Sequence, residues 1–387
     1  MPLTGITVLE VGVFMAGPYA TMQLADLGAE VLKIENPAGG DPVRQAGPFV
    51  DGASSPFARL NRNKKSVALD LKAPDGRAAF RRLAEDADVL VENLRPGALR
   101  SLQLGYDTLR HVNPGLIYAS ASGWGQDGPL ATLPGLDIMA QARSGLMSIT
   151  GSPGGQPAKV GVPVCDLVCG MYVAMAVLAA LHERERSGDG QFIDVSLLES
   201  GVSLAVWEAG KYFATGEVGG PLGTAHQSQA PYQAVQCSDG WLTVGAITAK
   251  AWQGLCDVLG LRALVEDERF ADAYRRKKNV DELIGLIEEA TRHRTVAELV
   301  TALDNAQVPC APISDYGDVF TAEALTERDF FWDAPGGVRQ LGSPMRFART
   351  PTQRNTAGPA LGADTRAALL AVGYTNDEVD ALLGGQS

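Results

Sequence analysis

The chain is short of positive charge: its 387 residues include 33 lysines and arginines against 45 aspartates and glutamates, a net charge of −12. A protein whose main partner is nucleic acid or an anionic membrane needs a basic face. The deficit therefore argues against both kinds of partner. It does not exclude a small anionic ligand, because a few arginines and lysines can form a local site.

Cysteine and histidine are also scarce. The five cysteines are odd in number and form no C-x-x-C pair, and the four histidines are dispersed. We therefore expect neither a zinc site nor a disulfide framework. This use of cysteine is typical of a protein in a reducing cytoplasm.

No hydrophobic run is long enough to cross a bilayer comfortably, since a membrane-spanning helix needs about 20 apolar residues. The longest run, residues 167–181, is followed by the charged segment HERER and is better interpreted as a buried helix. The N-terminal residues MPLTGITVLEVG lack the features of a signal peptide and are typical of a first strand. The sequence predicts a soluble, cytoplasmic protein.

The first half of the chain alternates apolar, β-branched runs with helical patterns. Alternation at this spacing is typical of βαβ units and predicts an α/β fold with a mainly parallel sheet. The predicted strands are residues 6–12, 30–35, 66–71, 88–94, 115–123 and 191–197. The main predicted helices are residues 74–87, 137–147, 167–186 and 199–215.

The pattern of predicted elements changes after the glycine-rich segment GEVGGPLG (216–223), which is the best candidate for a linker. Beyond it a β-hairpin, several helices and a short strand predict a smaller α+β domain at about 222–325. The predicted helices there are 248–259, 280–292 and 295–306, and the strand lies around VPCAPI. The C-terminal segment is predicted to hold a strand near PMRFA and helices at 363–372 and 375–384.

General nucleotide-binding and hydrolase motifs are absent. The first predicted strand is followed by VGVFMAGPYA, which is not G-x-G-x-x-G, and neither a Walker A motif nor G-x-S-x-G is present. The segment GWGQDGP (123–129) follows a predicted strand and would lie at the carboxyl end of the sheet, where open α/β sheets bind ligands. From the residues alone, a simple connection between strand and helix is equally consistent with this segment.

Segments that run in order from residue 3 to about 385 resemble the class III CoA-transferase family, which includes formyl-CoA transferase, carnitine CoA-transferase and α-methylacyl-CoA racemase. The matching segments include LTGITVLEVG, AGPYATMQLADLGAEVLKIE, NRNKKS, ADVLVENLRPGAL, GLDIMAQARSGLM and PVCDLVCG. The resemblance implies a large Rossmann-like domain whose parallel sheet is formed by both chain ends (1–205 and 330–387). It further implies a small domain at 222–325, linkers at 206–221 and 326–329, and an obligate homodimer of interlocked subunits.

The resemblance also implies a nucleophile, Asp166, in the pattern D-x-x-x-G that Gly170 completes. Its carboxylate would attack an acyl-CoA thioester, form a mixed anhydride and then an aspartyl-CoA thioester, and pass CoA to a second carboxylic acid. We expect this carboxylate to be ionised at pH 7 without a general base. Taken alone, Asp166 is equally well suited to be the N-cap of the helix 167–186.

Further site residues are implied by the same motifs. The predicted CoA contacts are Phe14, Met15, Arg44, Leu60, Lys64, Asn93, Leu94, Arg95, Ala98 and Arg100. Leu136 and Asp137 are predicted to lie in the substrate pocket. The partners are acyl-CoA and carboxylic acids, with CoA as a substrate; no metal and no permanently bound cofactor are expected. Met15, where formyl-CoA transferase has glutamine, argues against exchange between formate and oxalate.

Two alternatives to a CoA-transferase stay open. A racemase of this family needs a histidine before the aspartate of a G-H-D-type segment. This chain has Gly135-Leu136-Asp137 there, and leucine cannot transfer protons. A non-catalytic acyl-CoA-binding protein is the other alternative, and the intact Asp166 motif argues against it.

Overall fold

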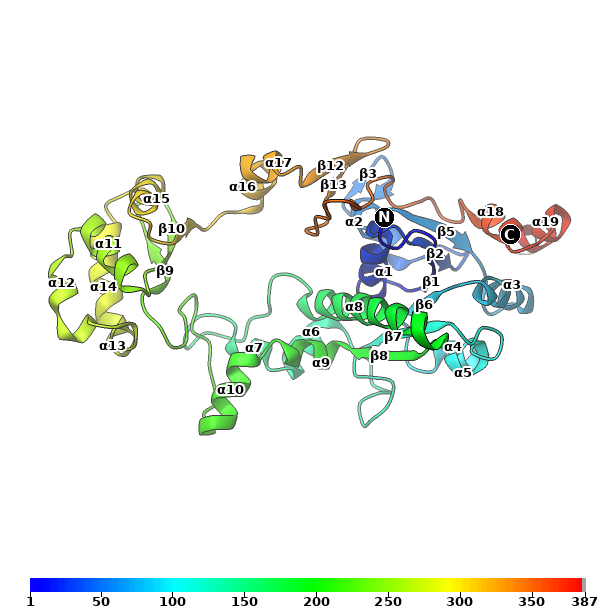
Figure 1. The fold of residues 1–387 in the computed structure, drawn as a ribbon, viewed down its shortest axis with the longest axis horizontal. Helices are drawn as coiled ribbons and strands as arrows, with labels where there is room; N and C mark the ends of the chain where they lie inside the picture. The colour runs from blue at the N-terminus through cyan, green and yellow to red at the C-terminus, as the bar shows by residue number, and fades with distance from the viewer. Residues whose placement is uncertain (385–387) are drawn as a thin grey trace. The chain divides into compact units, whose positions relative to one another are not determined.

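The computed structural model describes residues 1–384, and the chain forms two compact units (Figure 1). Unit 1 comprises Met1–Met147, Lys159–Glu217 and the C-terminal part from Thr326. Unit 2 comprises Ser148–Ala158 and Val218–Leu325. The short segment Ser148–Ala158, which the sequence assigned to the large domain, thus groups with the middle of the chain.

Unit 1 contains a six-stranded, fully parallel sheet with the strand order β5-β2-β1-β6-β7-β8. Its strands are β1 (Thr7–Val11), β2 (Glu30–Glu35), β5 (Lys64–Ala68), β6 (Val89–Glu92), β7 (Ile117–Ser122) and β8 (Phe192–Ser196). The predicted α/β fold is confirmed. The chain adds β2 and β5 on one side of β1 and then β6, β7 and β8 on the other side, so the topological switch point lies between β1 and β6.

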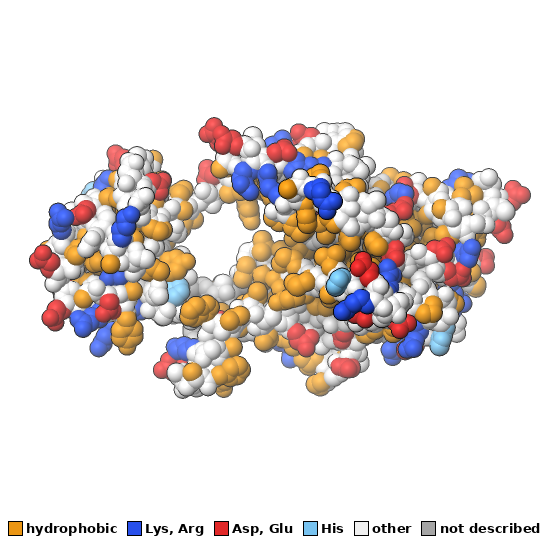
Figure 2. Space-filling view, in the orientation of Figure 1, with side chains coloured by type: hydrophobic (Ala, Val, Ile, Leu, Met, Phe, Trp, Pro, Cys, Tyr) orange, Lys and Arg blue, Asp and Glu red, His pale blue; other side chains and the backbone are white. Residues whose placement is uncertain are grey.

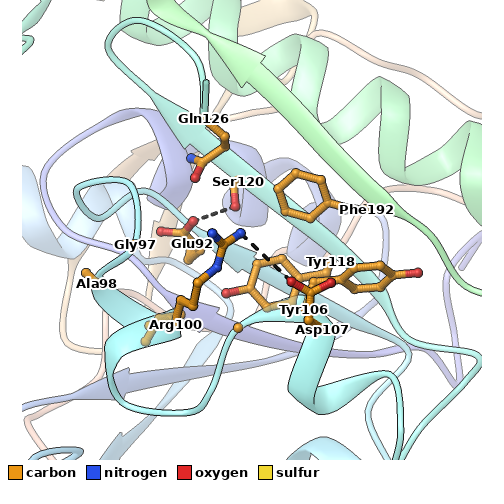
Figure 3. A pocket seen from close by; sticks show the side chains of 12 residues that line it. Glu92, Gly97, Ala98, Arg100, Tyr106, Asp107, Tyr118, Ser120, Gln126 and Phe192 are labelled. Atoms are coloured by element: carbon orange, nitrogen blue, oxygen red, sulfur yellow. Dashed lines mark hydrogen bonds and ion pairs between the residues drawn. The ribbon is translucent and has the colours of Figure 1, made fainter. Parts of the chain in front are cut away.

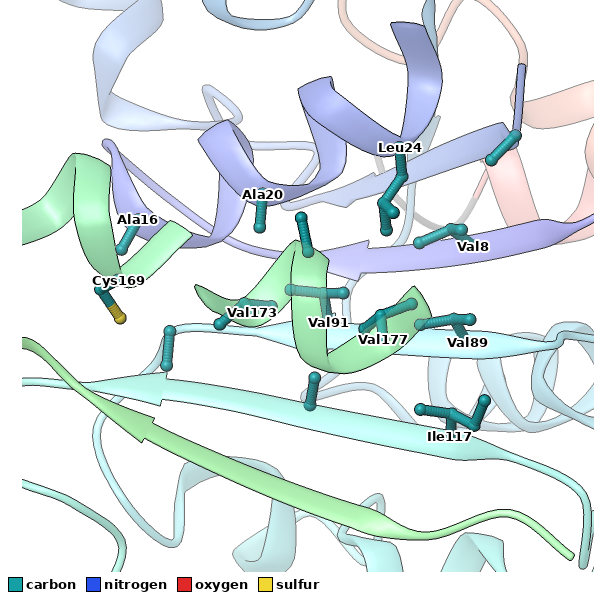
Figure 4. Close-up of a cluster of buried hydrophobic side chains, with 14 of the residues drawn as sticks. Val8, Ala16, Ala20, Leu24, Val89, Val91, Ile117, Cys169, Val173 and Val177 are labelled. Carbon is teal, nitrogen blue, oxygen red and sulfur yellow. The ribbon is translucent and has the colours of Figure 1, made fainter. Parts of the chain in front are cut away.

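Helices cover both faces of this sheet, so the central strands are almost continuously buried, as parallel strands usually are. On one face, α1 (Ala16–Asp26) and α8 (Val164–Ser187) pack against alternate strand residues such as Val89, Val91 and Ile117 (Figure 4). The other face carries α3 (Pro74–Glu85), α4 (Ala98–Ser101), α5 (Tyr106–Leu109), α18 (Thr365–Ala371) and α19 (Asn376–Gly384).

One side of the long helix α8 is buried, and the helix carries apolar side chains on its exposed side as well. Among residues 1–384 it is the one helix whose length and composition would allow it to cross a membrane, and 44% of its apolar window is buried. Its outer side exposes Met171, Met175 and Leu178, and Figure 2 shows hydrophobic side chains gathered over this part of unit 1. The helix begins three residues before the predicted start at 167.

Several predictions of local structure in unit 1 are wrong. The predicted helix 199–215 is two helices, α9 (Leu197–Ser203) and α10 (Val206–Thr215). Helix α10 occupies most of the linker predicted at 206–221. The segment PMRFA forms no strand; instead β12 (Phe331–Ala334) and β13 (Val338–Leu341) form a hairpin that the sequence did not reveal. The helical pattern 137–147 corresponds to α6 (Asp137–Arg143) and the start of α7 (Leu146–Ile149).

The remaining short elements of unit 1 lie between β2 and β5. They are η1 (Pro42–Gln45), β3 (Phe49–Val50), β4 (Ala53–Ser54) and α2 (Ser55–Leu60). The side chain of Ser54 caps α2 by accepting from the Phe57 N–H.

Unit 2 is the predicted α+β arrangement. Its antiparallel sheet has the order β11-β10-β9, with strands β9 (Tyr232–Gln236), β10 (Trp241–Gly245) and β11 (Cys310–Pro312). Its helices and turns are α11 (Ala249–Leu259), α12 (Ala263–Glu266), η2 (Glu268–Phe270), α13 (Ala273–Lys278), α14 (Val280–Thr291), α15 (Val296–Asn305), α16 (Tyr316–Thr321) and α17 (Glu323–Glu327). Trp252, Phe270 and Ile287 lie in its core.

Candidate active site

A pocket of about 440 Å³ lies at the carboxyl ends of β1 and β6, which is the switch point of the sheet. Ligands in open α/β sheets bind at this place. The pocket is lined by residues that follow β1, β6 and β7 and by the first turns of α1, α6 and α8. The lining residues are Val13–Ala16, Asn93–Pro96, Ala121–Trp124, Ala131, Leu133–Asp137, Asp166 and Leu197.

Most of the predicted site residues come together here. Asp166 shares the pocket with Phe14, Met15, Asn93, Leu94, Arg95, Leu136 and Asp137. These residues come from four separate parts of the sequence. The segment GWGQDGP also contributes, because Gly123 and Trp124 line the wall.

The turn between β1 and α1 is held in an unusual conformation. Phe14 has a φ of 58°, in the left-handed region, which costs a residue other than glycine about 1–2 kcal/mol. Asn93 holds the preceding residue: its Oδ1 accepts from the Val13 N–H at 2.9 Å, and its Nδ2 donates to the Val13 carbonyl at 2.8 Å. Asp41 Oδ1 accepts from the Phe14 N–H at 3.2 Å. Asn93 therefore shapes the pocket through the backbone of Val13.

A buried group of charges lies beneath this turn. Lys33 Nζ is 2.6 Å from Glu10 Oε1 and 2.9 Å from Asp41 Oδ2, and Lys64 Nζ is 2.8 Å from Glu10 Oε2. All four side chains are 0% exposed. Burial by itself would raise the pKa of Glu10, but the two ammonium groups lower it to about 2. The carboxylate thus stays ionised and holds both lysines in place.

This arrangement corrects the predicted role of Lys64. Its ammonium also donates to the Pro18 carbonyl and to Asn61 Oδ1, so its donors are used inside the protein. Lys64 is therefore not placed to contact CoA, because no part of its side chain reaches the surface.

Arg44 and Leu60 likewise lie outside the pocket. Arg44 forms a two-point ion pair with Glu35, donates to the Pro359 carbonyl at 3.0 Å and lies over the Phe57 ring at 3.8 Å. Leu60, the last residue of α2, is buried and only 8% exposed. Arg44 therefore joins the C-terminal segment to β2, and neither residue lines the site around Asp166.

Asp166 stands in the first turn of α8, whose N-cap is Pro163. The alternative that Asp166 caps the helix is therefore wrong. The capping contact comes from Asp137, whose Oδ1 accepts from the N–H groups of Cys165 (2.9 Å) and Asp166 (3.3 Å). Gln141 donates to the other oxygen of Asp137 at 2.7 Å. Asp137 thereby fixes the backbone that carries the Asp166 carboxylate.

The pKa of Asp166 is raised to about 7, first because burial disfavours the charged form and second because the Asp137 carboxylate is close. The expectation that Asp166 is fully ionised at pH 7 is therefore wrong. A carboxyl with such a shift inside a pocket is typical of a functional group.

Gly170, one helical turn after Asp166, lies where α8 leaves no room for a side chain. A Cβ at this position would lie 2.8 Å from the Ala16 carbonyl oxygen and 3.0 Å from Cδ1 of Tyr19. The missing side chain lets α8 pack directly against α1. Close packing brings Asp166 and the first residues of α1 into the same pocket.

Two predicted contacts, Ala98 and Arg100, lie in a different pocket (Figure 3). Arg100 is strongly exposed and lies 3.9 Å from Asp107.

The sequence did not single out Asp41, whose carboxylate accepts from the Phe14 N–H and holds this turn. A sequence signal for it exists only in the phrase GDPVR, where aspartate before proline is typical of a cap. In residues 1–384, no group of His, Cys, Asp and Glu is arranged to hold a metal ion.

Comparisons with known proteins agree on one family. The family model described as CoA-transferase family III matches residues 3–365. The succinate–glutarate CoA-transferase of Agrobacterium fabrum is 38% identical over 375 residues, which are 93% of each chain. The succinyl-CoA:glutarate CoA-transferase of Mus musculus is 36% identical over 99% of this chain and 89% of its own. A crystal structure of a CaiB/BaiF family protein from Brucella suis superposes with a TM-score of 0.88 at 36% identity, covering 96% of this chain and 99% of that one.

Proposed function

The chain belongs to CoA-transferase family III and is an acyl-CoA:carboxylate CoA-transferase, and on that premise we propose that Asp166 is its covalent nucleophile. The observation that carries this proposal is the position of Asp166 in the pocket at the switch point of the sheet. Among the residues that line this pocket, none is His, Lys, Cys or Tyr. Ser122 also lines the pocket, but the lining holds no histidine or lysine that could activate its hydroxyl. The two carboxyl groups are therefore the candidate nucleophiles, and Asp137 already accepts hydrogen bonds from the first turn of α8.

The reaction would proceed by exchange at carbonyl carbons. An oxygen of Asp166 attacks the thioester carbon, the C–S bond breaks, and a mixed anhydride and CoA thiolate form. The thiolate then attacks the Asp166 carbonyl carbon and expels the first acid, which leaves an aspartyl-CoA thioester. The second acid attacks the carbonyl carbon of this thioester, the C–S bond breaks, and a second mixed anhydride and CoA thiolate form. The thiolate then attacks the carbonyl carbon of the new acyl group, which gives the new acyl-CoA and frees the Asp166 carboxylate. No net proton transfer is needed.

The surroundings of Asp166 suit these steps. Helix α1 begins at the pocket and no side chain caps it, so its positive end favours the oxyanions that develop. Trp124, Leu133 and Leu136 give the pocket apolar walls. Such walls limit access of water to an anhydride that would otherwise hydrolyse.

We propose small dicarboxylic acids as the exchanged substrates. Relatives of similar length are named for succinate and glutarate. Arg95 is the sole positively charged residue that lines the pocket in the described part of the chain, and it could pair with the second carboxylate or with CoA.

The test is a panel of donors and acceptors with the purified protein. With succinyl-CoA and glutarate we expect glutaryl-CoA, and with succinyl-CoA alone we expect hydroxylamine to convert Asp166 to a hydroxamate that mass spectrometry detects in its tryptic peptide. If no acyl-CoA of the panel yields either product, the proposed mechanism is wrong. Incorporation of deuterium at the α-carbon without exchange of CoA would instead indicate a racemase, which the leucine at position 136 disfavours.

We further propose that two copies of the chain form a homodimer. Helices α8 and α10 expose large apolar side chains, including Met175 (57%), Val206 (73%) and Phe213 (84%). Apolar surface of this extent usually marks a protein interface. Sedimentation at micromolar concentration should give twice the chain mass of 40.7 kDa. A stable monomer under these conditions would contradict the proposal.

Replacing Asp137 by asparagine should move the pH dependence of the reaction. The amide oxygen of the D137N variant can still accept from the first turn of α8, but the charge that raises the pKa of Asp166 is gone. For the wild type, kcat/KM should rise with pH up to about 7, because the ionised carboxyl is the nucleophile. In D137N the midpoint should fall, yet stay above the ordinary value of 3.8, because burial persists.

The measurement is kcat/KM for succinyl-CoA between pH 5 and 9. For each protein, kcat/KM at pH 5.5 is divided by its value at the high-pH plateau. We expect this ratio to be roughly 3- to 10-fold larger for D137N than for the wild type. Asp189, an exposed aspartate beyond the end of α8, supplies the control, and D189N should keep the wild-type profile. An unchanged midpoint in D137N would show that Asp137 does not act on Asp166 electrostatically.

A further inference from the structure

A second pocket, of about 290 Å³, lies on the other face of the sheet (Figure 3). It shares no lining residue with the pocket of Asp166, although the same two segments, after β6 and along β7, contribute to both. Side chains alternate along β7: Ala119 and Ala121 face α8, whereas Tyr118 and Ser120 face this second pocket. The steps proposed at Asp166 make no use of it, although two of the predicted CoA contacts, Ala98 and Arg100, are part of its lining.

The floor of the pocket is a buried carboxyl group without a cation. Glu92 is 5% exposed; its Oε2 accepts from the Leu94 N–H at 2.8 Å and its Oε1 from the Ser120 hydroxyl at 2.5 Å. In residues 1–384 no Lys, Arg or His forms an ion pair with Glu92, and the charged group that acts on it is another carboxyl, Asp194. Burial, reinforced by Asp194, raises the pKa of Glu92 to about 7.

Aromatic side chains form one wall. The rings of Tyr106, Tyr118 and Phe192 contact one another with centroids 5.7–6.1 Å apart. On the opposite side, the amide nitrogen of Gln126 is buried and has no hydrogen-bond partner in the described part of the chain. The pocket therefore combines an apolar wall, a carboxyl and an amide that a ligand could engage.

The charges at the rim nearly cancel. Arg100, from α4, and Asp107, from α5, lie 3.9 Å apart, and their side chains are 80% and 78% exposed. Water screens such a pair strongly. The unbalanced charge in the lining thus comes from the buried carboxyl group of Glu92 on β6, and the exposed Asp194 on β8 adds negative charge near it.

We propose that this pocket binds a small organic cation with an aromatic body, whose positive group pairs with Glu92 and whose ring packs on Tyr106 and Phe192. A buried carboxylate is stabilised by a hydrogen-bonded cation. Aromatic faces attract cations at the same time. An anion would instead meet the carboxyl group of Glu92 and an exposed arginine, Arg100, that is already paired with Asp107.

Three probes of equal size test the charge: benzylammonium, benzyl alcohol and benzoate, titrated into the full chain by calorimetry at pH 7.5. We expect benzylammonium to bind at least about tenfold more tightly than benzyl alcohol, a difference typical of one charge-assisted hydrogen bond. Benzoate should be the weakest. At pH 6, binding of benzylammonium should release a proton to the buffer, because Glu92 must ionise to pair with it.

Variants assign the effect to Glu92. E92Q should lose the preference for benzylammonium over benzyl alcohol, whereas D107N, at the exposed rim, should change the affinity less than about threefold. R100A should bind benzylammonium as well as or better than the wild type. If E92Q fails to fold, the proton release of the wild type still decides the matter.

Several results would overturn the proposal. They are no binding of benzylammonium up to millimolar concentration, benzoate binding more tightly than benzylammonium, and an unchanged preference in E92Q. Competition by CoA would also overturn it, because the pocket would then belong to the transfer site. None of these results depends on whether Asp166 is the nucleophile, so the two proposals fail separately.

Discussion

Replacing Asp166 by asparagine should lower the rate of CoA transfer by at least about 10⁴-fold, because the amide cannot form the anhydride and thioester on which the proposed route depends. The amide has nearly the same size as the carboxyl and leaves the backbone N–H of position 166 free to donate to Asp137. The pocket and its affinity for CoA should thus be kept. Steady-state transfer from succinyl-CoA to glutarate measures the loss, and binding of CoA by calorimetry serves as the control for intact structure.

The same variant should be more stable than the wild type, and the gain should grow with pH. The pKa of Asp166 is about 7 in the folded protein and ordinarily 3.8, so the folded state binds the proton more tightly than the unfolded state. Stability contributed by the protonated carboxyl is therefore lost as pH rises from about 4 through 7. Asparagine carries no charge and avoids this loss. Thermal unfolding should show a larger gain in Tm at pH 8 than at pH 5.

These two readouts separate a nucleophile from a structural aspartate. If D166N loses activity and also loses stability at every pH, Asp166 acts by holding the fold. If D166N retains activity, the covalent route is wrong. D189N, which replaces an exposed aspartate by the same amide, should match the wild type in both rate and pH dependence.

Local patterns were enough to predict most of the sheet in unit 1. The apolar run 30–35 corresponds to β2 without any shift, because its residues are buried on both faces and turns bound it. The strand predicted at 66–71 begins two residues earlier, at Lys64. The sequence pattern excluded this lysine because a charged side chain is rarely buried alone. Its partner, Glu10, lies 54 positions away and cannot be found from local patterns.

In the candidate site, too, local patterns predicted some residues, whereas others depend on contacts between distant segments. The motif around Asp166 and the turns after the first and fourth predicted strands identified most of the pocket, since parallel strands bring their carboxyl ends to one edge. The ion pair of Arg44 with Glu35 was not predicted, because a basic residue in a glycine-rich turn has no visible partner in the sequence. The cap that Asp137 provides for α8 also depends on contacts between distant segments. Long-range contacts of this kind decide which polar groups face a ligand.

Replacing Gly170 by alanine should reduce both activity and stability, against the usual effect of this change in a helix. Alanine normally favours a helix over glycine by about 1 kcal/mol. Here the new Cβ would lie 2.8 Å from the Ala16 carbonyl oxygen and 3.2 Å from the Ala20 nitrogen, both backbone atoms that cannot rotate away. Helices α1 and α8 must then move apart, and overpacking of this kind costs about 1–3 kcal/mol.

The displacement matters for catalysis because α8 carries Asp166 and α1 begins at the opposite wall of the same pocket. A shift of about 1 Å between reacting groups can cost about 100-fold in rate, so we expect kcat to fall by roughly that factor. Gly285, which lies inside α14 with open space where a Cβ would lie, is the matched control. G285A should be slightly more stable than the wild type in urea and equally active. If G170A behaves like G285A, Gly170 is not what brings the two helix ends together, and the D-x-x-x-G pattern needs another physical reason.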